Sequence, residues 1–200
     1  MNRIHIAGLA AMLGGVALFA DLALRLFSGF GPAYFILAVP MALCLAGAPL
    51  GLRMLSVVAA GWRNILAWSG TAITLLGVAL WLIAFVTLFF NPAAAFTQRL
   101  TPGGSLLLAV GMVVLGVAVL ASRRLPGWRR FAPLAVGLYF PLQLVFQLAF
   151  FLNGRDGAPG PNGALLGAWG LLWALVGYGI FTSAQPTKRG SMTQAVRTSV

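Results

Sequence analysis

Six long apolar runs, separated by short polar or basic stretches, constrain the fold of this chain more than any other feature. They lie at residues 4–23, 33–50, 65–90, 105–121, 131–152 and 164–182. Each comes near the roughly 20 mostly apolar residues that a helix needs to cross a membrane. The runs are continuously apolar rather than alternating, which favours helices over a β-barrel. The sequence therefore predicts an all-α polytopic bundle in which residues 1–183 contain six transmembrane helices.

The composition agrees with a lipid environment. Hydrophobic residues fill 60% of the 200 positions, more than a soluble domain of this length can hide from water. The net charge of +11 would suggest nucleic-acid binding in a soluble protein. Here the basic residues lie singly or in short clusters between apolar runs, so we expect anionic lipid headgroups as their partners and no nucleic acid.

The basic residues are distributed unevenly if all six runs cross the membrane from a cytoplasmic N-terminus. The inner segments then carry Arg3, Arg53, Arg63, Arg123, Arg124, Arg129, Arg130, Lys188, Arg189 and Arg197, and the outer segments carry Arg25, Arg99 and Arg155. Cytoplasmic loops hold the excess of Lys and Arg. The four arginines of "SRRLPGWRR" therefore set the orientation, with both termini cytoplasmic, and residues 184–200 are predicted to form a disordered cytoplasmic tail.

Two segments allow alternative interpretations. The first run has the basic start and apolar stretch of a signal peptide, but cleavage after Ala20 would place Leu18 where a small residue is needed, so we expect an uncleaved helix. Residues 51–64 form either an amphipathic helix at the inner interface or an early start to the third span. Three tryptophans lie near predicted inner boundaries, where indole rings act as anchors: Trp62, Trp68 and Trp128.

Residue types that support catalysis are scarce. His5 is the only histidine and Cys44 the only cysteine, and there is no glutamate. These counts exclude a haem held by two histidines and a thiolate metal cluster. The only lysine, Lys188, lies in the tail, outside any span that could hold a retinal-type Schiff base. We expect no enzymatic activity, no metal and no cofactor.

One pair of charged residues, Asp21 and Arg25, lies on one helical face near the outer end of the first run. An acidic residue near a membrane suggests a gate or an ion site. Since both side chains can reach water from this position, we prefer an interfacial ion pair.

The fifth run carries the principal candidate site. Pro141 falls in its middle, where it removes a helical hydrogen bond, and Gln143 and Gln147 follow on one face with Tyr139 one turn before. Amides in hydrocarbon need partners, so this face is expected to point into the bundle. It serves either interhelical hydrogen bonding or the binding of a small polar solute, for which a kink at Pro40 in the second run would supply the other wall.

Two stretches resemble each other in register. GLAAMLGGVALF (8–19) and GTAITLLGVALW (70–81) share Gly, Ala, Leu, Gly, Val, Ala and Leu at equivalent positions. A duplication of helical hairpins explains this similarity, and so does a shared Gly/Ala/Leu-rich composition.

Three further stretches, AGLAAMLGGVALF (7–19), RRLPGWRR leading into LAVGLYF (123–140) and LLGAWGLLWALVGYGIF (165–181), resemble small multi-pass membrane proteins of bacteria without assigned activity. This resemblance implies a bundle in the bacterial inner membrane and transfers no catalytic residues. In architecture the chain is also similar to the substrate-binding subunits of vitamin importers, whose coupling motifs it lacks.

The expected function is therefore non-enzymatic: helix packing, or contacts with a membrane-protein partner or a second copy of the chain. The alternative is a transport component that binds a small polar solute between the kinked second and fifth spans.

Overall fold

The computed structural model describes most of the chain as helix. The described ranges are 2–28, 33–56, 61–91, 96–123, 125–152 and 163–183. Within them, only the backbone is described at residues 22–28, 33–36, 56, 97–98, 148–152 and 163–164. The helices are α1 (Arg3–Ser28), α2 (Ala33–Leu45), α3 (Gly47–Ser56), α4 (Trp62–Phe90), α5 (Thr97–Ser122), the 3-10 helix η1 (Gly127–Arg130), α6 (Ala132–Leu152) and α7 (Gly163–Ser183). No strand occurs in these ranges, and the predicted all-α fold is confirmed.

Within the described ranges, five helical segments are long and apolar enough to cross a membrane. They are Arg3–Asp21, Leu37–Leu55, Trp62–Phe90, Arg99–Ser122 and Leu165–Ser183. These match the first, second, third, fourth and sixth predicted spans. The fifth prediction coincides with α6, whose described apolar stretch, Ala132–Gln147, is shorter than the others.

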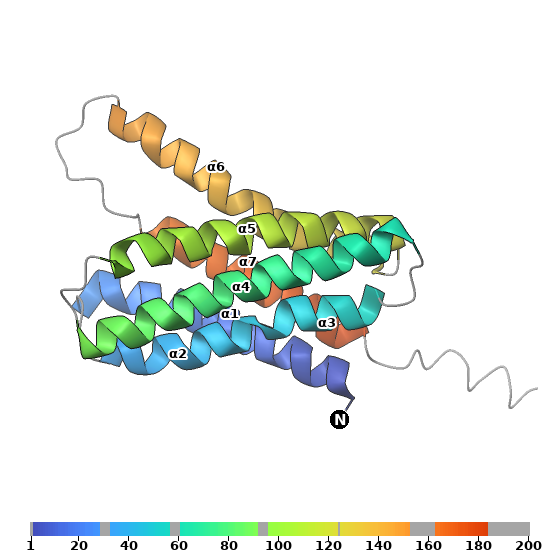
Figure 1. The fold of residues 1–200 in the computed structure, drawn as a ribbon, viewed down its shortest axis with the longest axis horizontal. Helices are drawn as coiled ribbons and strands as arrows, with labels where there is room; N and C mark the ends of the chain where they lie inside the picture. Colours follow the sequence, from blue (N-terminus) through green and yellow to red (C-terminus); the bar gives the residue numbers. More distant parts are fainter. Residues whose placement is uncertain are drawn as a thin grey trace, which may run out of the picture.

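The helices run in alternating directions along the bundle, except that α3 continues in the direction of α2 (Figure 1). At the end that we call the basic end, α1, α4 and α6 begin and α3, α5 and α7 finish. At the opposite end, α1, α4 and α6 finish and α2, α5 and α7 begin. The basic end takes its name from the arginines of these termini and of η1, which are Arg3, Arg53, Arg63, Arg123, Arg129 and Arg130.

Two antiparallel helix pairs dominate the packing, α1 with α7 and α4 with α5. Both pairs are held close by glycines seven residues apart: Gly8 and Gly15 on α1, Gly170 and Gly177 on α7, Gly70 and Gly77 on α4, and Gly104 and Gly111 on α5. A Cβ at Gly8 would lie 2.6 Å from the backbone nitrogen of Phe181, and a Cβ at Gly70 would lie 2.6 Å from that of Leu115. The absence of side chains therefore lets the backbones touch, as in other membrane helix pairs.

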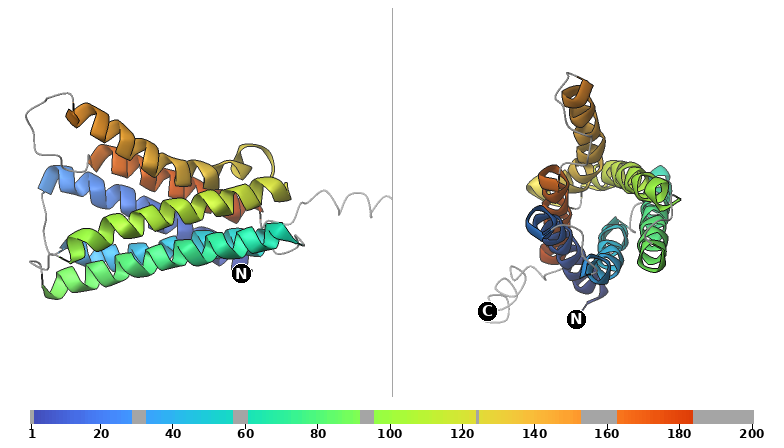
Figure 2. Two further views of the ribbon diagram at one scale, coloured as in Figure 1. Left: turned by 45° about the horizontal axis from the view of Figure 1, so that its top comes forward. Right: turned by 90° about the vertical axis from the view of Figure 1, so that its left-hand side faces the viewer.

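Aromatic side chains fill much of the interior between these pairs. The ring of Trp169 lies 5.9 Å from that of Trp81, 5.1 Å from Phe140 and 6.0 Å from Trp173, measured between centroids. Both Trp169 and Trp173 are almost wholly buried. Figure 2 (right) views the bundle along its axis, with α1, α2, α4, α5 and α7 surrounding this interior.

The second predicted span is a broken helix. Pro40 lies inside α2, and Ala46 interrupts the helix before α3. Residues 51–56 continue α3, whereas 62–64 begin α4 after Gly61, whose φ of 74° turns the chain. Residues 57–60 lie outside the described residues, so both interpretations of residues 51–64 stay predictions.

Candidate functional site

Helix α6 joins the bundle through its first half. Gly116 of α5 is opposite Leu134, where a Cβ would lie 2.7 Å from the backbone nitrogen, and α6 also packs on α7. Toward its C-terminal end α6 diverges from the other helices (Figures 1 and 2). Beyond Pro141, Leu142 and Val145 are 66% and 64% exposed. This half of α6 therefore presents apolar side chains that no described helix covers.

The polar side chains of α6 differ in whether they have hydrogen-bond partners. The hydroxyl of Tyr139 donates a 2.8 Å hydrogen bond to the carbonyl of Leu165, at the start of α7. Gln143, one turn later, is only 7% exposed, and its Oε1 has no hydrogen-bond partner among the residues described. Gln147 is half-buried, and its Nε2 is likewise without a partner in that part of the chain. Two amide groups on one face of α6 are thus left unsatisfied.

Pro141 leaves one backbone carbonyl of α6 without its usual helical hydrogen-bond donor. Pro141 lacks an N–H, which frees the carbonyl of Gly137. The indole of Trp169 donates a 2.9 Å hydrogen bond to the neighbouring carbonyl, that of Val136. Tyr139 and Trp169 therefore tie the first half of α6 to α7, and the amides beyond Pro141 take no part in that contact.

The two helices that contain internal prolines, α2 and α6, do not share a principal interface. Helix α2 packs on α1, α3 and α4, whereas α6 packs on α5, α7 and η1. Buried side chains such as Leu45, Leu108 and Met112 occupy the core of the bundle. The structure thus separates Pro40 from Pro141 instead of placing them on either side of one cleft.

Asp21 is buried in the protein, with only 4% of its surface exposed. Its carboxylate therefore does not have the open access to water that we expected from the sequence. The side chain of Arg25 lies outside the described residues, so the predicted ion pair stays a prediction.

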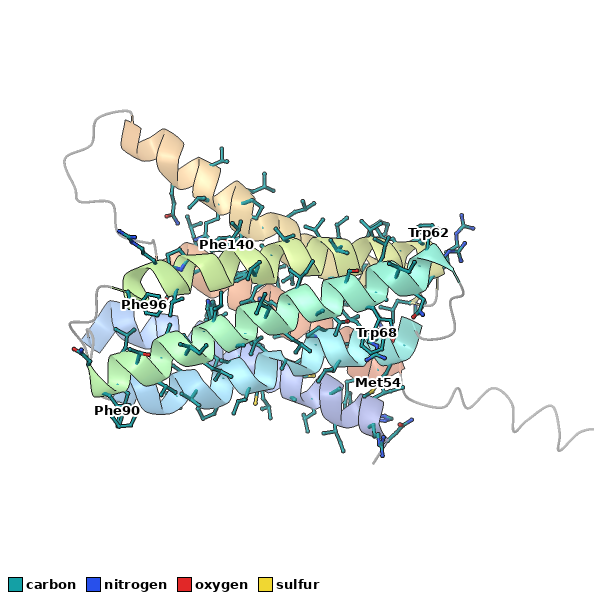
Figure 3. The ribbon with its side chains drawn as sticks, viewed as in Figure 1. Met54, Trp62, Trp68, Phe90, Phe96 and Phe140 are labelled. Carbon is teal, nitrogen blue, oxygen red and sulfur yellow. The ribbon has the colours of Figure 1, made fainter. Side chains whose placement is uncertain are left out.

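Arginines at the basic end lie over aromatic rings. The guanidinium carbon of Arg53 is 3.1 Å from the ring centroid of Trp68, and that of Arg130 is 4.7 Å from Phe131. Figure 3 labels Trp68 on α4 and, nearer the end of the bundle, Trp62. The three anchoring tryptophans predicted from the sequence are each about half exposed. Rings and cations together suit a boundary between lipid and water.

Three of the four arginines that are predicted to set the orientation lie between the end of α5 and the start of α6. Arg123 ends α5 with a φ of 51°, in the left-handed region, while Arg129 and Arg130 belong to η1. Arg124 lies outside the described residues.

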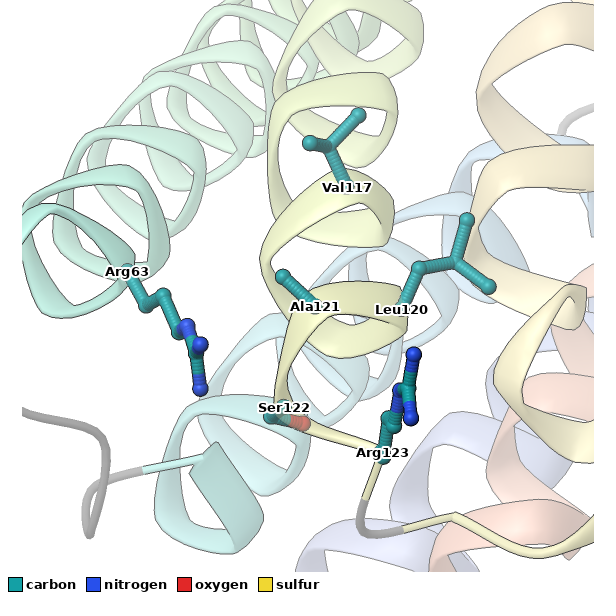
Figure 4. A pocket seen from close by; sticks show the side chains of 6 residues that line it. All are labelled: Arg63, Val117, Leu120, Ala121, Ser122 and Arg123. Carbon is teal, nitrogen blue, oxygen red and sulfur yellow. The ribbon is translucent and has the colours of Figure 1, made fainter.

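An open pocket of about 610 Å³ lies between the start of α4 and the end of α5 (Figure 4). Its lining residues are Arg63, Val117, Leu120, Ala121, Ser122 and Arg123. None of the sites predicted from the sequence includes this pocket. A signal was present, because Arg63 and Arg123 flank the third and fourth predicted spans on the same side of a helical hairpin. Within the described ranges, no three or more His, Cys, Asp or Glu side chains form a group able to hold a metal ion.

These features define a membrane-embedded helical protein, with five helices suited to crossing a bilayer and apolar side chains on their outer faces. Comparison of the chain with protein-family models, with curated proteins and with solved structures found no match.

Proposed function

We propose that the chain is a six-span protein of the bacterial inner membrane, with both termini cytoplasmic, that pairs α6 with a transmembrane helix of a partner. On this proposal it is not an enzyme. The observation that carries it is the second half of α6, which leaves the bundle with exposed apolar side chains and two unsatisfied amides.

The direction of the helices supports a sixth span. Helix α5 ends at the basic end and α7 begins at the opposite end, so the chain between them must cross the full length of the bundle (Figure 1). Helix α6 is 21 residues long, and at ~1.5 Å per residue it covers about 31 Å, close to the hydrocarbon thickness. The basic end then faces the cytoplasm, because inner loops carry the excess of arginine.

The chemistry of α6 favours a helix as its partner. Membrane helices gain little from burying apolar surface, because lipid is equally apolar, and they associate through close packing and polar side chains. Gln143 offers an unsatisfied acceptor and Gln147 an unsatisfied donor. Gln147 is the half-buried one of the two, and an amide both donates and accepts, so a second copy of α6 packed beside Gln147 offers it the matching group.

Cysteine cross-linking in native membranes tests this pairing. In a Cys44→Ala background, Leu144→Cys is expected to give a discrete cross-linked species, of twice the monomer mass for a second copy. Residue 144 is 48% exposed and lies one turn from Gln147 on neighbouring surface. Leu76→Cys provides the control, because residue 76 is 54% exposed and lies on α4, away from α6. Equal cross-linking at the two positions, or none at residue 144, contradicts the proposal.

The same unsatisfied amides support a second function, the binding of a small polar solute by a transport component. Replacing Gln143 and Gln147 together by Leu separates the two functions. For helix pairing, we expect the Leu144→Cys cross-link to weaken by the ~0.6–2 kcal/mol typical of polar contacts between membrane helices. For solute binding, the cross-link persists and thermal stabilisation by the solute disappears. A double variant that changes neither readout excludes a functional role for both amides.

A further inference from the structure

We propose that the pocket between Arg63 and Arg123 binds the phosphate group of an anionic phospholipid at the basic end of the bundle. This site is separate from the α6 surface and does not depend on the function proposed for it.

The geometry presents two cations to one open space. Arg63 extends from the first turn of α4 and Arg123 from the end of α5, and Figure 4 shows their side chains on either side of Ser122. A guanidinium group donates paired hydrogen bonds that match the oxygens of a phosphate. The pocket volume of about 610 Å³ lies within the range of roughly 300–1,000 Å³ found for small-ligand sites.

The protein supplies little negative charge to neutralise this pair. Asp21 is the only acidic residue in the described ranges, and it lies in the second half of α1, toward the opposite end. The start of α4 adds to the positive potential, because no side-chain hydrogen bond caps it and a helix N-terminus attracts anions. A bound anion would therefore neutralise positive charge that the described residues leave unbalanced.

The backbone at Arg123 sets the direction of its side chain. Its φ of 51° makes it the one non-glycine residue with a positive φ in the described ranges, and it caps the C-terminal end of α5. A left-handed residue is a common way to end a helix. At this position the side chain of Arg123 lies beside Leu120 at the edge of the pocket (Figure 4).

The apolar wall favours a lipid over a soluble ion. Val117, Leu120 and Ala121 line the pocket on the last two turns of α5. A phosphate held by the arginines would leave an acyl chain free to run along this wall into the bilayer. Basic pockets at the cytoplasmic side of membrane helices bind anionic headgroups in this manner.

The test uses the full-length protein in nanodiscs of phosphatidylcholine, with or without phosphatidylglycerol. Phosphatidylglycerol is expected to raise the melting temperature of the wild type. In Arg63→Gln/Arg123→Gln this rise should disappear, and retention of phosphatidylglycerol in native mass spectrometry should fall roughly 30-fold. The matched control is Arg3→Gln/Arg129→Gln, which removes the same charge from the same end and should keep the rise. The melting transition in phosphatidylcholine alone shows whether each variant is folded. If Arg63→Gln/Arg123→Gln does not fold, the single variant Arg63→Gln takes its place.

Three results overturn the proposal. One is a rise that persists in the Arg63→Gln/Arg123→Gln variant, and another is an equal loss in both double variants, which indicates diffuse attraction. The third comes from inorganic phosphate added to phosphatidylcholine nanodiscs. If it reproduces the full rise through the same two arginines, the ligand is soluble phosphate instead of lipid.

Discussion

Gly177→Ala is expected to lower the free energy of unfolding by about 1–3 kcal/mol or more, the cost of inserting a methyl group into a closed interface. A Cβ at this position would collide with the backbone nitrogen of Met12 and lie 2.7 Å from the carbonyl oxygen of Gly8. Both atoms belong to the main chain of α1, so relief requires the whole helix to move. Thermal unfolding in detergent, followed by circular dichroism, measures the loss.

A matched control lies in the same bundle. At Gly103 a Cβ would meet no atom within 4 Å, so Gly103→Ala should leave the melting temperature unchanged or raise it through the better helix propensity of alanine. Gly111→Ala is expected to behave like Gly177→Ala, because its Cβ would collide with Thr74 of α4. If Gly177→Ala were as stable as Gly103→Ala, the α1–α7 contact described above would be wrong.

Reporter fusions should give an all-or-none result on orientation. A reporter that is active only outside the cytoplasm is expected to be active after Thr101 and Asn162 and silent after Arg189. The reason is that the basic end, with its arginines, remains on the cytoplasmic side. Thr101 lies in the first turns of α5, at the opposite end of the bundle.

The fusion after Asn162 tests α6 directly. Silence there means that α6 does not cross the membrane, which leaves five spans and removes the surface proposed for partner binding. Activity after Arg189 reverses the orientation of the last span. Either result contradicts the six-span topology with cytoplasmic termini.

The similarity between residues 8–19 and 70–81 illustrates the limit of sequence reasoning. The glycines shared by these stretches, Gly8 with Gly70 and Gly15 with Gly77, have equivalent roles in two antiparallel helix pairs. A duplication of hairpins would pair each helix with the next span. Helix α4 does pair with the next span, α5, but α1 pairs with the last, α7. The spacing of the shared glycines can be read from the sequence. Which helix, α2 or α7, packs on the glycines of α1 depends on which helix surfaces fit together.

Local chemistry determined the helices of this protein. Once a run is apolar and long enough to enter lipid, its backbone must satisfy its own hydrogen bonds, and a helix is the remaining solution. For that reason α4, α6 and α7 begin and end within a few residues of the predicted runs. The tertiary structure alone decided the burial and the hydrogen-bond partners of particular side chains. Burial of Asp21, the unsatisfied amide of Gln143 and the pocket shared by Arg63 and Arg123 all depend on contacts between segments far apart in the chain. Such contacts are selected by the fit of surfaces between helices, which no apolar run encodes on its own.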